Sequence, residues 1–264
     1  MKTTLITGAA GGMGHACAEK LIREGYTVFG LDINEPEPVD GLYFIRTDLT
    51  DPQSVNTAFD KVRSMTGELD CIINMAGMYG LDSLAEISEA EFNRIFQVNL
   101  FSVYRVNRTF LPLLSRGGRI VITSSELAPL DPLPFTGIYA ITKAAVEKYA
   151  YSLRMELQTQ GIKVIVIRPG AVNTDMLNAS VAALDAFCEK TSLYTANAAK
   201  FKGIVDKVEA RNIPPEKIAE LLWKALRSEN PRQVYSVNRN PLLLLLNILP
   251  KRLQTRIIVN IIRG

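Results

Sequence analysis

A tyrosine and a lysine four residues apart, in the stretch YAITK, are placed to do proton chemistry. On a helix, Tyr139 and Lys143 would share one face, with Cβ atoms about 5–6 Å apart. A phenol titrates near about 10, and a cation beside it lowers that pKa by favouring the phenolate. Tyr139 would then exchange a proton near neutral pH. An amphipathic helix with a packed tyrosine and a solvated lysine has the same spacing, so other residues must decide.

Short apolar runs alternate with longer helical patterns along the chain. Such alternation, with strands that are apolar on both faces, predicts an α/β fold with a doubly wound parallel sheet, a Rossmann fold, with about seven strands and helices on both faces. Strands are expected at 3–7, 27–31, 42–45, 69–74, 119–124, 163–168 and 233–237. Helices are expected near 13–24, 52–65, 88–114, 138–160 and 215–229.

Composition places the chain among ordinary globular proteins. Its 264 residues are 47% hydrophobic and 22% charged, without a Pro/Gly/Ser-rich linker, which fits one domain with a sizeable core. Three scattered cysteines and a single histidine predict reduced thiols, no metal site and a cytoplasmic protein. The N-terminus runs directly into a strand, so no signal peptide is expected.

A glycine-rich stretch, TGAAGGMG, follows the first expected strand and opens a helix. Gly8, Gly12 and Gly14 permit a tight turn and a close approach of a pyrophosphate to the backbone. The helix N-terminus supplies free N–H donors and the positive end of the helix dipole. The stretch therefore predicts a dinucleotide site, whereas a flexible turn is the alternative for a glycine trio by itself.

Asp32 ends the second expected strand, about 20 residues beyond the glycines. A carboxylate there accepts hydrogen bonds from a ribose 2′-OH and repels a 2′-phosphate. No basic residue lies in the glycine loop or beside Asp32 in the sequence. We therefore expect NAD(H) in preference to NADP(H), although a turn or capping aspartate would look the same.

The spacing T-G-x-x-x-G-x-G followed by Y-x-x-x-K resembles the short-chain dehydrogenase/reductase family, including its hydroxysteroid and retinol dehydrogenases. Further family marks are TDLTD, NMAG (74–77), VNL, ITSS and RPGAVNT (168–174), with Met75 in place of a second asparagine. The resemblance covers about residues 3–237. The cofactor contacts that it implies are Thr7, Gly8, Gly12, Met13, Gly14, Asp32, Asp48, Leu49, Asn74, Ala76, Gly77, Tyr139, Lys143, Pro169, Gly170, Val172 and Thr174.

The resemblance also implies a catalytic set of four residues. Tyr139 would exchange a proton with the reacting oxygen, and Lys143 would acidify the phenol and bind the nicotinamide ribose. Ser125 would hydrogen-bond the same oxygen, with Ser124 structural. Asn99 would hold a water that relays protons to Lys143. Beside them, Glu126 either binds a polar substrate group or, as we prefer, is a solvated or ion-paired carboxylate.

Three segments bear on the substrate and partners. Residues 175–212 are the variable substrate-covering segment of domain 1–238 and are rich in small and apolar residues. Together with residues 127–135 they could line an apolar pocket. Residues 239–264 form a basic amphipathic tail with five basic residues and no acids, too interrupted to span a membrane. We expect this tail to pack within the chain or against a subunit, in preference to contact with an anionic membrane surface.

The sequence thus predicts an NAD(H)-dependent oxidoreductase that interconverts a secondary alcohol and a ketone, with a lipophilic, steroid- or retinoid-like substrate. The alternatives are a catalytically silent dinucleotide-binding regulator and a membrane-surface protein driven by the tail. A homodimer or homotetramer is implied by the family resemblance. Nucleic acid is not an expected partner, because residues 1–238 hold 25 basic and 27 acidic residues.

Overall fold

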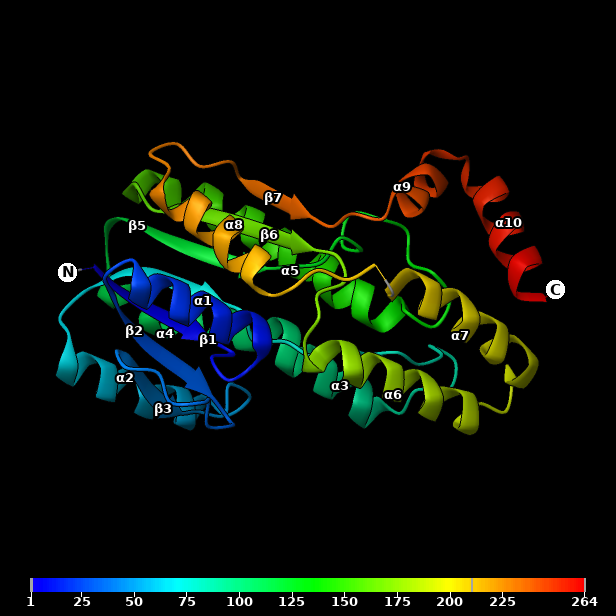
Figure 1. Ribbon diagram of the computed structural model, residues 1–264, viewed down its shortest axis with the longest axis horizontal. Coiled ribbons are helices and arrows are strands. Elements are labelled where there is room, and N and C mark those ends of the chain that lie inside the picture. Colours follow the sequence, from blue (N-terminus) through cyan, green and yellow to red (C-terminus); the bar gives the residue numbers. More distant parts are fainter. Residues whose placement is uncertain (1, 210, 264) are drawn as a thin grey trace.

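Seven parallel strands form one sheet in the order β3-β2-β1-β4-β5-β6-β7 (Figure 1). The structure is a computed structural model that describes residues 2–209 and 211–263. Residues 1, 210 and 264, which belong to the segments predicted above, lie outside the described residues. The strands are β1 (Lys2–Thr7), β2 (Tyr26–Asp32), β3 (Leu42–Arg46), β4 (Leu69–Asn74), β5 (Leu114–Thr123), β6 (Lys163–Pro169) and β7 (Val234–Val237). The chain reverses direction across the sheet between β1 and β4, where ligands bind in such folds. The predicted doubly wound fold is confirmed.

Helices cover both faces of the sheet (Figure 1). On one face, α1 (Gly12–Arg23) and α8 (Glu216–Arg227) bury Leu21 and Leu222 against the strands. On the other, α2 (Pro52–Met65), α4 (Ser102–Phe110) and α5 (Gly137–Leu157) bury their apolar side chains. The strands are apolar on both sides because successive residues point to opposite faces of the sheet. Leu5 packs in the core under α2, α4 and α5, and Ile6 packs in the core under α1 and α8.

The helix predicted over 88–114 is not continuous, which corrects the expectation. The structure has α3 (Glu89–Phe96), a π-helical turn η1 (Gln97–Phe101), α4 and a 3₁₀ turn η2 (Leu111–Leu113). Asn99 lies in the π turn, a feature that is frequent at functional sites. Pro112 lacks the N–H that would continue α4, and β5 begins at Leu114, earlier than the predicted 119.

Four further helices form the end of the molecule beyond the carboxyl ends of the strands (Figure 1). They are α6 (Asp175–Lys190), α7 (Thr195–Glu209), α9 (Pro241–Ile248) and α10 (Lys251–Arg263), and a 3₁₀ turn η3 (Gln158–Gln160) extends α5. Ile262 of α10 packs in a cluster with Phe187 of α6 and Phe201 of α7. Part of the tail is therefore packed within the chain. Of the helices in 2–209 and 211–263, none combines the length and apolar character that crossing a membrane requires.

Candidate active site

The glycine loop between β1 and α1 has the geometry of a phosphate cradle. Gly8 adopts φ +72°, and a Cβ there would lie 2.8 Å from the Ala76 backbone nitrogen, so the loop can pass β4 only as glycine. A Cβ on Gly14 would collide with the Gly8 carbonyl oxygen. The N-cap of α1, Gly11, makes no side-chain capping bond, and the first turn has no acidic residue. Free N–H donors and the positive dipole end are thus available to a pyrophosphate.

Asp32 ends β2 beside this loop. Its Oδ2 accepts a hydrogen bond of 3.0 Å from the Ala10 backbone N–H, and its Oδ1 accepts one of 3.1 Å from that of Asn34. A carboxylate has further lone pairs for a ribose hydroxyl. Arg46 on β3 is the register partner of Asp32, a basic neighbour that linear spacing does not reveal. The carboxylate therefore both fixes the glycine loop and faces the dinucleotide cleft.

Most predicted cofactor contacts line one long cleft at the carboxyl ends of β1, β2 and β4. These lining residues are Gly8, Gly12, Met13, Gly14, Asp32, Asp48, Leu49, Ala76, Gly77 and Thr174. The glycine cradle and the uncapped helix end fit the diphosphate of a nicotinamide dinucleotide, and Asp32 fits its adenosine ribose. The Asp48 carboxylate accepts hydrogen bonds from the backbone and hydroxyl of Thr50, which fixes the cleft wall after β3.

Thr7 and Asn74 lie behind the cleft and not in its lining. The Thr7 hydroxyl accepts a 3.2 Å hydrogen bond from the Ala76 backbone N–H. The Asn74 amide donates to Asn107 Oδ1 at 2.9 Å and to the Val121 carbonyl. These two side chains hold β1, β4 and β5 together, so that they support the cleft from the interior of the protein.

A second, mostly apolar cavity adjoins the cleft. Both are lined by Met13, Met75, Gly77, Tyr79, Thr174 and Met176. Pro169, Gly170 and Val172 line the second cavity at the end of β6. Gly170 is required there because a Cβ would collide with the Asn238 carbonyl oxygen. The junction of the two cavities is thus where a nicotinamide ring and a substrate would meet.

Three of the four predicted catalytic residues line this second cavity: Ser125, Tyr139 and Lys143. Tyr139 is 8% exposed on the first turn of α5 and makes a side-chain hydrogen bond with Ser125, which follows β5. The Ser125 hydroxyl also accepts from the Leu127 backbone N–H at 3.2 Å. A carbonyl oxygen placed beside Ser125 and Tyr139 would therefore meet two hydroxyl groups.

Burial governs the protonation of the tyrosine and lysine. In the chain by itself, burial raises the pKa of Tyr139 to about 12, and the hydrogen bond with Ser125 lowers it less. Burial also lowers the pKa of Lys143 to about 8. The pKa of Tyr139 is thus shifted upward, whereas the sequence predicted that the lysine would lower it. The reason is that removal from water penalises the charged form of each group. The Lys143 ammonium lies 5.7 Å from the centre of the Tyr139 ring.

Lys143 and Asn99 approach each other beside Gly77. The Lys143 ammonium donates to the Thr123 carbonyl at 3.2 Å, and a Cβ on Gly77 would lie 3.3 Å from Nζ and 3.4 Å from Asn99 Oδ1. The Asn99 amide exchanges two hydrogen bonds with the Met78 backbone, at 2.8 and 3.0 Å. It also donates to the Thr142 hydroxyl at 3.1 Å. Asn99 therefore ties the chain after β4 to α5, and its role as holder of a relay water stays a prediction.

The two residues that flank Ser125 have distinct partners. The Ser124 hydroxyl donates to Glu147 at 2.8 Å, and Glu147 forms an ion pair of 2.5 Å with Arg168, which agrees with a structural role for Ser124. Glu126 was expected to be solvated or ion-paired, but it is 8% exposed and lines the apolar cavity. Burial raises its pKa, and its Oε2 accepts a 2.6 Å hydrogen bond from the Asn240 backbone N–H at the start of α9. Burial corrects the expectation of a solvated carboxylate, whereas the Asn240 N–H and the positive charge of Arg239, both of which lower the pKa, connect Glu126 to the tail.

Residues that sequence reasoning missed complete the cavity wall. Tyr79, two residues beyond the NMAG block, lies with its ring centre 4.9 Å from that of Tyr139. Leu243 of α9 reaches the cavity from the tail, 104 residues beyond Tyr139 in the chain. Apolar lining also comes from the predicted segments: Leu127, Leu133, Met176, Leu177, Phe201, Ile204 and Val205.

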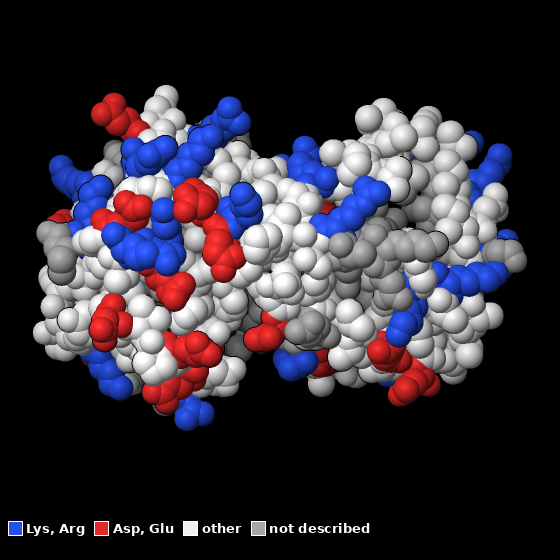
Figure 2. Space-filling view, viewed as in Figure 1, with Lys and Arg blue, Asp and Glu red and all other residues white. Residues whose placement is uncertain are grey.

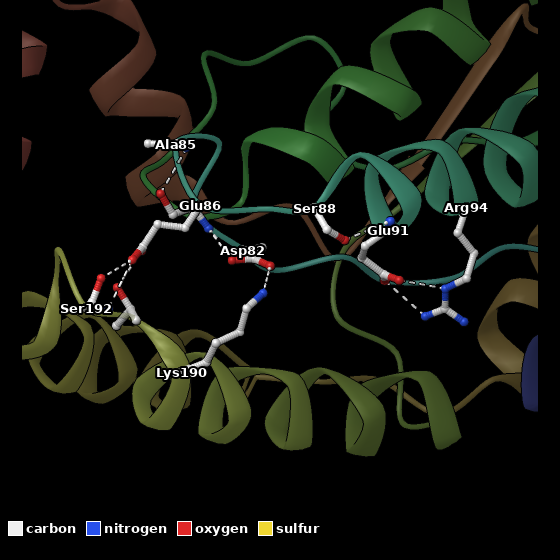
Figure 3. A network of polar contacts seen from close by, with 10 residues as sticks. Asp82, Ala85, Glu86, Ser88, Glu91, Arg94, Lys190 and Ser192 are labelled. Atoms are coloured by element: carbon white, nitrogen blue, oxygen red, sulfur yellow. Dashed lines mark hydrogen bonds and ion pairs between the residues drawn. The ribbon is translucent and has the colours of Figure 1, made fainter.

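The chain after β4 is fixed to the far end of α6 by polar contacts (Figure 3). Lys190 forms an ion pair with Asp82 at 2.8 Å. Glu86 accepts from the Thr191 hydroxyl at 2.6 Å and from the backbone and hydroxyl of Ser192 at 3.0 Å. These hydrogen bonds lower the pKa of Glu86 to about 2, and the bond from Thr191 makes the largest contribution. These contacts anchor the C-terminal end of α6 to the chain after β4.

The depressed pKa of Lys143 predicts a pH-dependent stability. Between about pH 8 and 10.5 the unfolded lysine holds a proton that the folded one has lost, so folding stability rises with pH there. We expect the Lys143→Met variant to be more stable than the parent at pH 7. Its advantage in the unfolding constant should shrink by up to about tenfold per pH unit across that window. Urea unfolding at several pH values measures this difference, with Lys148→Met, at an exposed lysine of the same helix, as the control. A Lys143→Met difference that does not change with pH would contradict the prediction.

Comparison with known proteins gives a consistent result. Residues 2–185 match the family model described as short chain dehydrogenase. The chain is 33% identical to uncharacterized oxidoreductase YbbO of Escherichia coli over 97% of this chain and 94% of that protein. It is 30% identical to 3-ketodihydrosphingosine reductase of Bacteroides thetaiotaomicron over 86% and 84%. A short chain dehydrogenase family protein of Francisella tularensis superposes with a TM-score of 0.76 at 24% identity, over 90% and 97%.

The match covers the glycine loop, both strand ends that carry Asp32 and Ser125, and the whole of α5. Members of this family bind a nicotinamide dinucleotide and act as oxidoreductases, which agrees with the cleft and the hydroxyl pair described above. The chain is a member of the short-chain dehydrogenase family.

Proposed function

We propose that the protein is an NAD(H)-dependent oxidoreductase that interconverts a secondary alcohol and a ketone on a lipophilic substrate. The observation that carries the proposal is the placement of Ser125, Tyr139 and Lys143 on an apolar cavity that opens into the glycine-loop cleft. The cofactor supplies hydride transfer when bound. The chain has to move one proton and polarise one carbon–oxygen bond.

In the reducing direction, Tyr139 donates its phenolic proton to the substrate oxygen as the carbonyl carbon gains a hydride, which leaves an alcohol and a phenolate. Ser125 donates a hydrogen bond to the same oxygen, where negative charge develops. Lys143 stabilises the phenolate and has further N–H donors to offer a ribose. Oxidation reverses each step: the phenolate takes the alcohol proton.

The preference for NAD(H) rests on Asp32. Its carboxylate lies in the cleft beside the glycine loop, where it accepts from a ribose 2′-OH and repels a 2′-phosphate. Arg46 on β3 is the register partner of Asp32, so a basic residue lies on the neighbouring strand. A neutral side chain at position 32 would remove the negative charge and leave this basic residue in place.

The preference for a lipophilic substrate rests on the wall of the second cavity. Leu133, Phe201 and Leu243 come from three separate segments and turn apolar side chains to the same space. The name of the Bacteroides relative, a 3-ketodihydrosphingosine reductase, supports a lipid-like ketone. Steroid- and retinoid-like compounds have the same apolar character and belong in the first substrate panel.

We also propose a cytoplasmic homodimer or homotetramer. Cys17 and Cys71 are buried free thiols, which supports a reducing compartment. Aromatic side chains on α4 and α5 stay exposed, with Tyr104 at 42% and Tyr151 at 57%, which supports a subunit contact on that face.

Replacing the tyrosine tests the chemical step. Tyr139→Phe should lower kcat at least about a hundredfold, because the variant has lost the general acid and base, while NADH affinity stays within about threefold. NADH oxidation with a panel of lipophilic ketones, and NADH fluorescence titration, measure the two effects. The control Tyr151→Phe, on the exposed face of α5, should be fully active. Variant activity within tenfold of the parent would refute the assignment, and NADH binding without turnover by the parent would favour the silent regulator.

Neutralising Asp32 tests the cofactor choice. Asp32→Asn keeps an acceptor for the Ala10 N–H but removes the charge. The ratio of kcat/KM for NADH over NADPH should fall at least about tenfold, since the variant no longer repels a 2′-phosphate beside Arg46. Asp48→Asn, further along the same cleft, serves as the matched control. An unchanged ratio in Asp32→Asn would contradict the role given to Asp32.

A homologous series of 2-alkanols tests the apolar cavity. Each methylene that enters an apolar wall contributes about 0.8 kcal/mol. The kcat/KM for oxidation should therefore rise about fourfold per carbon from 2-butanol until the cavity is filled. Steady-state kinetics with NAD⁺ measures the series. A flat series, or one that falls from the shortest member, would show that the substrate is small or polar.

A further inference from the structure

Helix α9 exposes an apolar stripe to solvent. Leu242, Leu245 and Ile248 are 66, 61 and 79% exposed, and their spacing places them on one side of the helix. The other side is engaged: Leu243 lines the substrate cavity, and Asn247 accepts a 2.6 Å hydrogen bond from the Asp131 backbone N–H. The stripe is therefore the outward face of a helix that is fixed in place.

The segment that carries this stripe is basic. Residues 239–264 hold Arg239, Lys251, Arg252, Arg256 and Arg263 and no acidic residue. Lys251 pairs with Asp131, whereas Arg252 and Arg256 are exposed on α10. Figure 2 shows the upper part of this end of the molecule as white surface with blue side chains, and the red ones lie at its lower edge. The surface thus combines apolar and cationic groups, as interfacial membrane helices do.

The tail is already folded before it meets any partner. Ile258 and Ile262 of α10 pack on the cluster that contains Phe187 and Phe201. Asn197 of α7 donates to the Ile262 carbonyl at 3.1 Å. Leu253 and Ile261 remain 43 and 54% exposed on the outer side of α10. Binding by this surface would need no ordering of the chain, which removes an entropic cost.

We propose that the outer face of α9 and α10, defined by Leu242, Leu245, Ile248, Arg252 and Arg256, docks on the surface of an anionic lipid bilayer. The leucine and isoleucine side chains enter the boundary between headgroups and acyl chains, and the arginines bind lipid phosphates. A second copy of the chain fits less well. Twofold contact through this face would oppose arginine to arginine, and the segment has no acid to pair with them.

Bilayer docking also gives the proposed lipophilic substrate a route, a consequence that rests on the proposed function. Leu243 lies on the cavity side of the helix that carries the stripe, and the Glu126 carboxylate holds the start of that helix through the Asn240 N–H. Docking through the stripe would place this wall of the cavity next to the lipid. The surface binding itself is independent of catalysis and is tested without turnover.

Co-sedimentation of the full chain with vesicles tests the proposal. The probes are vesicles of phosphatidylcholine alone and of phosphatidylcholine with an equal part of phosphatidylglycerol. The parent should bind the anionic vesicles at least about tenfold more strongly, and binding should weaken as salt is raised. Equal binding to both vesicles, or no binding to the anionic ones, would overturn the proposal.

Matched variants locate the contact. Ile248→Glu should lower the partition onto anionic vesicles at least about tenfold, and Arg252→Gln with Arg256→Gln should remove most of the salt dependence. Met65→Glu, at an exposed apolar residue of α2, adds the same charge elsewhere and should bind as the parent does. NADH binding by each variant shows that it is folded. Parent-like vesicle binding by Ile248→Glu overturns the proposal, as does a fall in the native mass of Ile248→Glu by light scattering, which would assign the stripe to a subunit contact.

Discussion

Burial of one phenol and one ammonium in the same cavity wall is the constraint on which the site depends. Removal from water raises the pKa of Tyr139 and lowers that of Lys143, because burial penalises the charged form of each group in the chain by itself. The lysine therefore does not suffice to acidify the tyrosine. With NAD⁺ in the cleft, a further positive charge would lie near the phenol, and phenolate and ammonium would then stabilise each other where the dielectric is low. In this account the tyrosine becomes a base only when the cofactor is bound.

The rest of the fold keeps that pair dry and in place. The carboxyl ends of β4 and β5 supply Gly77 and Ser125, and α5 supplies the pair itself. Asn99 sits in a π turn that interrupts a long helix, and its amide binds the chain after β4 on one side and Thr142 of α5 on the other. The interruption brings a polar side chain to the point where three elements meet.

The sequence predicted most of what is local and little of what is distant. The glycine loop, the strands and the tyrosine–lysine pair have short-range signals, since spacing and alternation follow from strand and helix geometry. The π turn at Asn99 has no such signal, and the interior position of Asn74 depends on Asn107, 33 residues away. Glu126 was expected to be solvated or ion-paired, yet it is buried and accepts from a backbone N–H 114 residues later. Contacts of α9 and α10 with the cavity wall arise only from tertiary packing.

The ionisation of Tyr139 tests the central claim most directly. Ultraviolet titration of the parent minus Tyr139→Phe, at the tyrosinate absorption band, isolates this one phenol. Without cofactor it should titrate near a pKa of about 12. With saturating NAD⁺ the pKa should fall by several units toward neutral pH, because the added positive charge favours phenolate. A titration that is the same with and without NAD⁺ would contradict the account, since the tyrosine would then remain too weak an acid to exchange its proton with the substrate.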